Sequence, residues 1–344
     1  MQEIKISKDM EGQRLNKFLG KYLDAAPSSF IYKMLRKKNI KWNGKKAEGN
    51  ELLVAGDIIN IYMTDDTITK FRKDGCVPGV NQESDDIKQP LKNIPIIYES
   101  EDVLILNKPV GVLSQKAQPS DYSLNEMIVD YYRMRKEQSS LFTPSVCNRL
   151  DRNTSGIILA GMSLKGSQVL SKMLKERTVE KSYLTIVCGK VKEASTIKGF
   201  LTKKKNHNQV VVFSSLEEAK KAGTDKPAFI ETRYEPIASD MYEGLEYTLL
   251  RVWLITGKTH QIRAHLCSIG HPIVGDGKYG NKPINDRLRK DFSLKHQLLH
   301  AYEMQFPRKK EEPMIMDEIE LARFQAELPE EFCLVKEQIF KKKD

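Results

Sequence analysis

The chain has 344 residues, and its 56 Lys and Arg against 46 Asp and Glu give a formal net charge of +10. This length predicts about two domains, and the basic excess favours a polyanionic partner, nucleic acid before a membrane surface. The cysteines lack paired spacing, no apolar run could span a bilayer, and the start lacks a signal-peptide pattern. We therefore expect free thiols in a cytoplasmic protein with no membrane partner.

Residues 1–63 are typical of a small basic module with two helices and a hairpin. Apolar side chains recur at helical spacing in both helices, and Pro27-Ser28-Ser29 offers a cap for the second. Asn43-Gly44, a strong tight-turn signal, predicts a hairpin after Ile40–Trp42. The run from Lys33 to Lys46 is basic and contains no acid, the pattern of a solvated face or of a surface that binds a polyanion. The two apolar stripes are Leu15, Phe18, Leu19, Tyr22 and Leu23, then Phe30, Ile31, Met34 and Leu35.

The rest of the chain is expected to be a linker at 64–92, a large domain at 93–308 and a C-terminal extension at 309–344. Strand patterns at 103–106, 182–187, 229–234 and 247–255 have few helices between them. The clearest helices are predicted from Ser163 to Arg177 and from an N-cap at Thr259 to Gly270. This order predicts an α+β fold around a mixed, mostly antiparallel sheet; a doubly wound fold would need more regular strand–helix alternation.

One loop of the large domain carries an acid between two arginines. Arg149-Leu150-Asp151-Arg152 runs into Asn153-Thr154-Ser155-Gly156, which has turn chemistry, and then into an apolar strand pattern. A carboxylate held on a turn beside guanidinium groups is fixed in direction and reachable by substrate. A cluster of this kind on its own is more often a solvated surface loop, so its neighbours in sequence decide between the two interpretations.

The Arg-Leu-Asp segment resembles the signature of the RluA/RluD family of RNA pseudouridine synthases. Lys181-Ser182-Tyr183-Leu184 and the stretch from Thr256 to His265 resemble two further segments of that family. The flanking segments Lys108–Gly111, Gly275–Gly280 and Leu299–Ala301 fit it too. The sequence departs from the family pattern at Asn148, where the family usually has histidine.

The resemblance implies an enzyme that turns uridine into pseudouridine with no cofactor and no metal, since no atoms are lost. Asp151 would be the catalytic group acting near ribose C1′, and Tyr183 would stack on a flipped uracil with its hydroxyl near the proton lost from C5. Arg263 would be the cationic partner that a shielded carboxylate needs, because desolvation disfavours its charged form. Arg149 would fill the space that the base leaves in the RNA stack. Without the resemblance, Tyr183 would be interpreted as core packing and Arg263 as an exposed helix arginine.

The N-terminal module resembles the alpha-L (S-four type) RNA-binding domain, which implies a phosphate-contacting surface. Its residues would be Arg36, Lys37, Lys38, Lys41 and Lys45. The expected partner is RNA, large-subunit ribosomal RNA by resemblance with transfer RNA as the alternative, and we expect the protein to be a monomer.

Two other functions are considered: an RNA-binding assembly factor without chemistry, and an RNA methyltransferase that uses Cys147 or Cys267 as its nucleophile. The assembly factor would not need Asp151, Tyr183 and Arg263 together. The methyltransferase would need a glycine-rich cofactor loop after an early strand, which the chain lacks. The Gly275-x-Gly277-x-x-Gly280 string is interpreted as a loop, and the spacing of His260, His265, Cys267 and His271 fits no common zinc pattern.

Overall fold

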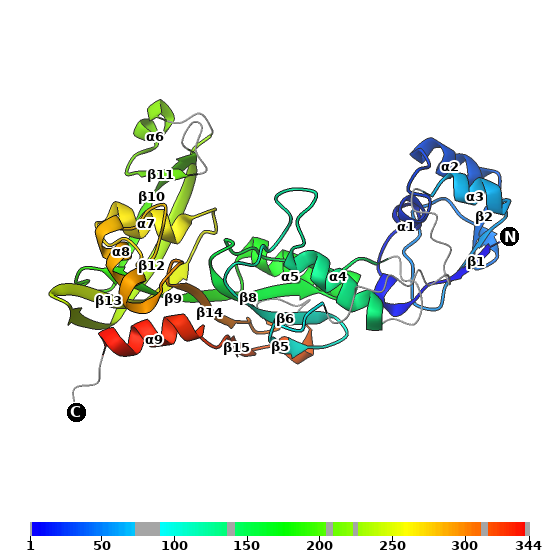
Figure 1. Cartoon of the computed structure of the whole chain (residues 1–344). Helices are drawn as coiled ribbons and strands as arrows, with labels where there is room; N and C mark the ends of the chain where they lie inside the picture. Colours follow the sequence, from blue (N-terminus) through cyan, green and yellow to red (C-terminus); the bar gives the residue numbers. More distant parts are fainter. Residues whose placement is uncertain are drawn as a thin grey trace.

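The computed structural model describes residues 2–72, 90–135, 142–203, 209–222, 226–310 and 316–340. It contains two sheets, one of four strands near the N-terminus and one of eleven strands in the large domain. The small unit lies at one end of the large sheet (Figure 1). No helix of the described residues has the length and apolar character to cross a membrane.

The N-terminal unit pairs two helices with its four-stranded sheet, whose strand order is β1-β4-β2-β3. The predicted stripes are confirmed: Leu15, Phe18, Leu19 and Tyr22 are buried on α1, and Ile31, Met34 and Leu35 on α2. The Asn43-Gly44 turn is confirmed as well, since both residues have positive φ and join β2 to β3. Its elements are β1 (Gln2–Lys5), η1 (Lys8–Met10), α1 (Leu15–Tyr22), α2 (Ser28–Arg36), β2 (Ile40–Trp42), β3 (Lys45–Lys46) and β4 (Ile58–Ile61).

Two features of this region were not expected from the sequence. Helix α2 has Pro27 at its N-cap position, and no side chain caps it. The start of the expected linker is helical: α3 (Asp65–Lys70) buries Ile68, and Phe71 packs against Phe30 of α2 with ring centroids 4.3 Å apart. Apolar contacts therefore extend the N-terminal unit past residue 63. Residues 73–89 of the expected linker lie outside the described residues.

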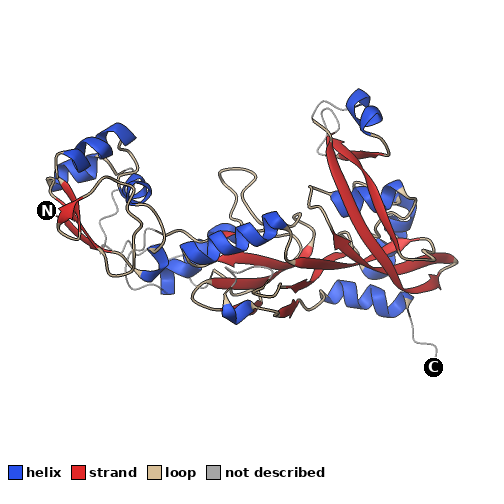
Figure 2. Ribbon diagram, turned by 180° about the vertical axis from the view of Figure 1, so that it is seen from behind, coloured by secondary structure: helices blue, strands red, loops and turns tan. Residues whose placement is uncertain are grey.

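The large sheet is mixed and mostly antiparallel, as predicted. Its main path is β11-β10-β12-β13-β9-β14-β8-β6-β5, with β15 paired to β14 and β7 to β8. Among the described pairs, β8 and β14 alone run parallel. Figure 2 shows its long strands, and β10 to β12 extend into an arm with α6 (Leu216–Ala222) at the tip (Figure 1). The strands are β5 (Ile96–Glu99), β6 (Val103–Lys108), β7 (Ser145–Val146), β8 (Ser155–Gly161), β9 (Glu180–Cys188), β10 (Ser195–Lys203), β11 (Val210–Phe213), β12 (Ala228–Tyr242), β13 (Leu245–Leu254), β14 (Leu299–Gln305) and β15 (Arg323–Gln325).

Helices cover both faces of this sheet because side chains alternate along each strand. On β6, Leu104 packs in the cluster that holds α4 (Leu124–Arg135) and α7 (Gln261–Ser268), whereas its neighbour Ile105 packs with α5 (Leu164–Glu176). Strand β9 alternates in the same way: Tyr183 faces α7, and Leu184 faces the cluster of α8 (Lys282–Phe292) and α9 (Glu330–Ile339). The core is thus two apolar layers with the sheet between them.

The predicted helix ends are partly right. Helix α5 is capped by Ser163 and ends at Arg177 in the left-handed region, as its sequence pattern predicts. The expected N-cap of α7 at Thr259 is wrong, since the helix begins after His260, which has φ 55° and no side-chain cap bond.

The C-terminal extension packs back onto the large domain. Strand β15 pairs with β14, and α9 buries Phe332, Val335 and Ile339. The short helix η2 (Asp317–Ile319) buries Ile319 on the α5 side. The extension therefore shares the two apolar layers of the sheet.

Candidate functional site

The Asp151 loop is tied by hydrogen bonds to the segment that follows β6. Ser114 Oγ donates to the Leu150 carbonyl at 2.9 Å and accepts from the Leu150 N–H at 3.0 Å. Gly111 N donates to the Arg152 carbonyl at 2.9 Å, and Arg152 Nε donates back to the Gly111 carbonyl at 3.0 Å. These bonds on both sides of Asp151 fix the backbone that carries its carboxylate.

Lys108 lies under this loop with its side chain fully buried. Its Nζ donates to the carbonyls of Pro109 at 2.8 Å, Val112 at 2.9 Å and Arg152 at 3.2 Å. Three acceptors match the three N–H groups of an ammonium. Burial lowers the pKa of Lys108 to about 7, and the charge of Asp151 acts in the opposite direction. Sequence reasoning noted Lys108 only as a flanking residue and gave it no role.

Arg263 contacts two carboxylates at once. Its NH1 donates to Asp151 Oδ2 at 2.8 Å, while Nε and NH2 hold the carboxylate of Asp276 in a bidentate pair at 2.7 and 2.9 Å. The Arg263 side chain is 6% exposed, that of Asp276 0% and that of Asp151 24%. Burial lowers the pKa of Arg263, but the two carboxylates outweigh it and raise the pKa above its ordinary value. The structure thus brings Arg263 to Asp151 as expected and adds a second acid.

Asp276 is a residue of this site that sequence reasoning missed. Burial raises its pKa, but the hydrogen bonds and charge of Arg263 and the N–H groups of Lys278 and Tyr279 hold the pKa below 3.8. Lys278 N and Tyr279 N donate to its Oδ1 at 2.8 and 3.1 Å. The signal in the sequence was the Gly-Asp-Gly turn at 275–277, which was interpreted as a loop without a role for the acid.

Tyr183 lies on the face of β9 that carries the pocket. It pairs with Val252 of β13 on one side and Ala301 of β14 on the other, and Ala301 pairs in turn with Gly156 of β8. Tyr183 is 6% exposed. Burial, and then the charge of Asp151, raises the pKa of its hydroxyl above the ordinary value, so the hydroxyl keeps its proton at neutral pH.

One pocket contains all the predicted active-site residues of the large domain. Asp151 comes from the loop before β8, Tyr183 from β9 and Arg263 from the first turn of α7. Exposed Arg149 lines the same pocket. The complete lining is Arg149, Leu150, Asp151, Thr154, Tyr183, Leu254, Lys258, His260, Gln261, Ile262, Arg263 and Leu299.

Asn148, the position that departs from the family pattern, binds the backbone of β8. Its Nδ2 donates to the Ile157 carbonyl at 3.1 Å, and its Oδ1 accepts from the Leu159 N–H at 2.7 Å. The side chain therefore anchors the loop to the strand, while the carboxylate of Asp151 turns toward Arg263.

The basic residues of the N-terminal unit are displayed on its surface. Arg36, Lys37 and Lys38 are exposed at the end of α2, and Lys45 is exposed on β3. Lys41 is half-buried, with its Nζ 5.0 Å from the centroid of the Tyr62 ring. Four of the five predicted RNA-binding residues of this unit are thus fully available to a partner.

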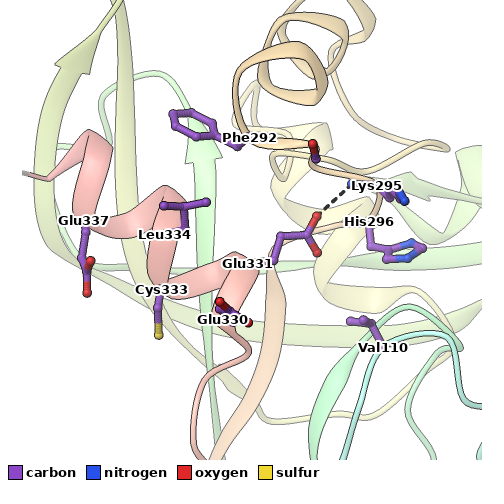
Figure 3. A pocket seen from close by; sticks show the side chains of 10 residues that line it. Val110, Phe292, Lys295, His296, Glu330, Glu331, Cys333, Leu334 and Glu337 are labelled. Atoms are coloured by element: carbon purple, nitrogen blue, oxygen red, sulfur yellow. Dashed lines mark hydrogen bonds between the residues drawn. The ribbon is translucent and has the colours of Figure 1, made fainter.

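A second, larger hollow of about 600 Å³ lies between α9 and the end of α8 (Figure 3). It is lined by Glu330, Glu331 and Glu337 of α9 and by Phe292, Lys295 and His296 on the opposite side. The Lys295 N–H donates to Glu331 at 3.0 Å. Its carboxylates would repel RNA phosphates, and it contains none of the predicted site residues.

The cysteine chemistry required by a methyltransferase finds no support in the geometry. Burial raises the pKa of both the Cys147 and Cys267 thiols, so both stay protonated at neutral pH. Neither residue lines the pocket with Asp151. Among the described residues, no three His, Cys, Asp or Glu side chains gather in a group that could hold a metal ion.

Residues 102–268 match the model of the RNA pseudouridylate synthase family. The chain is 30% identical over 307 residues to the ribosomal large subunit pseudouridine synthase C of Vibrio vulnificus, covering 89% of this chain and 88% of the relative. It is 31% identical to an uncharacterised RNA pseudouridine synthase of Mycoplasma genitalium, covering 88% of each.

Two solved human structures share the fold. Human RNA pseudouridylate synthase domain containing 4 aligns with a TM-score of 0.53 at 19% identity, over 71% of this chain and 92% of that one. Human RNA pseudouridylate synthase domain containing 1 aligns with a TM-score of 0.50 at 22% identity, over 71% and 94%. Sequence identity and coverage of the curated relatives agree with the fold, and the chain belongs to the RluA family of RNA pseudouridine synthases, enzymes that isomerise uridine to pseudouridine.

Proposed function

We propose that this protein isomerises uridines of large-subunit ribosomal RNA, with Asp151 as the catalytic group acting on a nucleotide flipped out of the RNA. The observation that carries the proposal is the Asp151 carboxylate, which Arg263 holds at 2.8 Å in a pocket shared with Tyr183. The large-subunit relatives support the choice of RNA by their names. Transfer RNA is the alternative substrate.

The chemistry needs an acid beside the sugar. Isomerisation breaks the bond between uracil N1 and ribose C1′, turns the base and rejoins it through C5. A carboxylate near C1′ can attack the sugar, stabilise positive charge on it or remove a ribose proton. In each route the Asp151 carboxylate must stay charged although water no longer solvates it. The Arg263 guanidinium stabilises that charge.

The burial of the site supports base flipping. Only 24% of the Asp151 side chain is exposed, and Tyr183 behind it is more buried still. A nucleotide stacked within a helix cannot bring its C1′ to such a group, so the base must leave the stack, which costs a few kcal/mol. Exposed Arg149 at the pocket is placed to occupy the vacated space with its planar cation.

In the pocket, the ring of Tyr183 would stack on the flipped uracil. Since the hydroxyl keeps its proton at neutral pH, it would act near C5 as a hydrogen-bond donor and not as a phenolate base. A Tyr183→Phe variant, which keeps the ring, separates stacking from this contact.

The test is tritium release from RNA labelled at uridine C5, with large-subunit ribosomal RNA fragments and transfer RNA transcripts offered in parallel. Asp151→Asn and Asp151→Ala should abolish release while RNA binding survives. Asp286→Asn on α8 is the matched control, because that acid is 52% exposed and outside the pocket. Activity retained in both Asp151 variants would overturn the proposal, and release from transfer RNA alone would reassign the substrate. Mapping pseudouridines in a strain that lacks the protein then identifies the target position.

A further inference from the structure

His260 is a pocket residue with an unusual backbone. It precedes α7 with φ 55° and ψ 16°, the left-handed region, which costs a non-glycine residue roughly 1–2 kcal/mol. Its side chain does not cap the helix and is 8% exposed. The ring lines the pocket together with Asp151, Tyr183 and Arg263. Strain of this kind persists where the surrounding structure fixes it, and functional sites are enriched in it.

The contacts of the ring favour one of its two neutral tautomers. The Tyr279 hydroxyl accepts from the Val210 N–H at 2.8 Å and lies 3.0 Å from His260 Nδ1. Because its oxygen already accepts one hydrogen bond, the hydroxyl can donate its own hydrogen to Nδ1. In a neutral imidazole the hydrogen then sits on Nε2, the nitrogen that faces Asp151 Oδ2 at 3.8 Å.

This distance is too long for a direct hydrogen bond and leaves His260 Nε2 available to a third group. Asp151 Oδ2 is already bound by Arg263 NH1. An oxygen of a nucleotide seated beside Asp151 would come within reach of the Nε2–H group.

We propose that His260 is a further catalytic residue: as a neutral imidazole it donates its Nε2–H to an oxygen of the flipped nucleotide beside Asp151, and Tyr279 holds it in that tautomer. The inference rests on the proposed function, since it assigns a contact to the same bound nucleotide.

The charges around the ring favour its neutral form. Burial lowers the pKa of His260; the charge of Asp151 opposes this, and the charges of Arg263 and Lys278 add to it. The imidazole is therefore neutral above its ordinary pKa of 6.5 and for some distance below it. The titratable and charged groups that act on the ring are Asp151, Asp276, Lys278, Tyr279 and Arg263, and Arg149 and Lys258 line the same pocket.

Three variants of His260 test the contact in single-turnover kinetics at pH 7. In His260→Gln the amide nitrogen takes the place of Nε2, so this variant should remain within about tenfold of wild type at pH 7. In His260→Asn the amide reaches only the Nδ1 position. His260→Asn and His260→Ala should therefore each lose on the order of 10²-fold in kcat, the cost of one missing donor. Asn tolerates the left-handed region well, so its loss would not be a backbone effect. Equal rates for Gln, Asn and Ala would overturn the proposal.

Tyr279→Phe tests the positioning role through the titration of the His260 ring. The hydroxyl stabilises the neutral imidazole by its hydrogen bond to Nδ1, so its removal should raise the pKa of His260. The imidazole of His260 should therefore titrate at a higher pH in Tyr279→Phe than in wild type, as followed by nitrogen-15 NMR. An imidazole that titrates at the same pH in both proteins would contradict the assignment.

Nitrogen-15 NMR of the imidazoles gives a readout that needs no activity. At pH 7 the His260 signal, assigned by its absence in His260→Gln, should show hydrogen on Nε2 alone, and Tyr279→Phe should show both tautomers. An Nδ1–H tautomer or an imidazolium in the wild-type protein would overturn the inference even in an active enzyme. Failure of the proposed function would appear separately, as a wild-type protein that releases no tritium.

Discussion

At the scale of single residues, Asp276 decides how Arg263 can act on Asp151. A lone arginine on the first turn of a helix has many rotamers, and holding it costs side-chain entropy. The bidentate pair with Asp276 uses Nε and NH2, and only NH1 is left to meet Asp151. Because Oδ1 of Asp276 is itself held by two backbone N–H groups, the guanidinium plane is fixed by main chain as well as by charge.

Asp276→Asn should therefore reduce both stability and activity. The amide can still accept from the Lys278 and Tyr279 N–H groups but leaves Arg263 with a missing counter-charge, which typically costs about 3–5 kcal/mol in a buried pair. A misdirected guanidinium should lower kcat by on the order of 10²-fold. Urea unfolding and single-turnover rates measure the two effects, with the exposed Asp286→Asn as control. A variant as stable and active as wild type would show that Arg263 is positioned by other contacts.

The same variant carries a pH signature. The pKa of Asp276 is lower in the folded protein than its value of 3.8 in the unfolded chain, so the unfolded chain binds more protons just below 3.8. The stability that ionised Asp276 gives the folded protein is complete above that pH. It is lost as the pH falls through the pKa of Asp276 in the folded protein. The stability gap between wild type and Asp276→Asn should accordingly be constant from neutral pH down to about pH 5 and close below 3.8.

Lys108 fixes the backbone of the Asp151 loop, as Asp276 fixes the guanidinium of Arg263. In Lys108→Met the apolar stem remains, but the carbonyls of Pro109 and Val112 lose their donor, while the Arg152 carbonyl keeps the Gly111 N–H. Each buried carbonyl left without a partner costs about 1–3 kcal/mol, so we expect a loss of about 2 kcal/mol or more. Hydrogen exchange at the amides near Asp151 should rise, and kcat should fall more than RNA affinity. The exposed Lys190→Met should stay within about 0.5 kcal/mol of wild type.

At the scale of elements, the parallel pair of β8 and β14 places the loop against the sheet. Gly156 makes this approach possible: it has φ 111°, and a Cβ there would lie 2.2 Å from the Ala301 carbonyl oxygen. Ala301 is also the neighbour of Tyr183, so any displacement of β8 changes the distance between Tyr183 and the Asp151 loop.

Gly156→Ala should consequently destabilise the protein strongly, on the order of 4 kcal/mol, by a backbone clash as well as by its conformation. Gly244→Ala separates the two causes, since it also has positive φ but a Cβ there meets nothing within 4 Å. That variant should cost only about 1–2 kcal/mol. Thermal unfolding of the two proteins provides the comparison, and equal losses would mean that β8 can move away from β14 without penalty.

The elements themselves were largely predictable, because local patterns determine them. Apolar spacing located α1, α2 and α5, and Ser163 marked the start of α5. The N-cap of α7 was not predictable, because His260 adopts a left-handed conformation under tertiary constraint. Lys108 and Asp276 were missed for a related reason: Lys108 meets Arg152 across 44 residues and Asp276 meets Arg263 across 13, and no helical or strand spacing shows that such residues meet.

At the scale of the whole molecule, the candidate catalytic pocket and the predicted basic RNA-binding surface belong to different parts of the chain. The pocket is built entirely from the large domain, whereas the acid-free basic run from Lys33 to Lys46 belongs to the small N-terminal unit. The hollow beside α9 has three glutamates and one lysine in its lining, so it is a poor site for RNA phosphates. The monomeric state and the domain boundaries expected from sequence stay predictions.

This division predicts that RNA affinity can be weakened without loss of chemistry. Lys37, Lys38 and Lys45 are exposed, so their joint replacement by Ala removes charge without disturbing a core, unlike Lys41, which packs against Tyr62. Each lysine that no longer neutralises a phosphate should reduce the slope of log affinity against log salt by about 0.7, or about 2 for the triple variant.

Titrating a large-subunit ribosomal RNA fragment at several salt concentrations measures this slope, and single-turnover rates at saturating protein should be unchanged. The matched control replaces Lys17, Lys21 and Lys70, which are equally exposed but lie on α1 and α3. Its slope should stay near that of wild type, since these lysines lie outside the predicted surface. If the first triple variant kept the wild-type slope, the phosphates would have to be bound by the large domain alone, and the N-terminal unit would need another role.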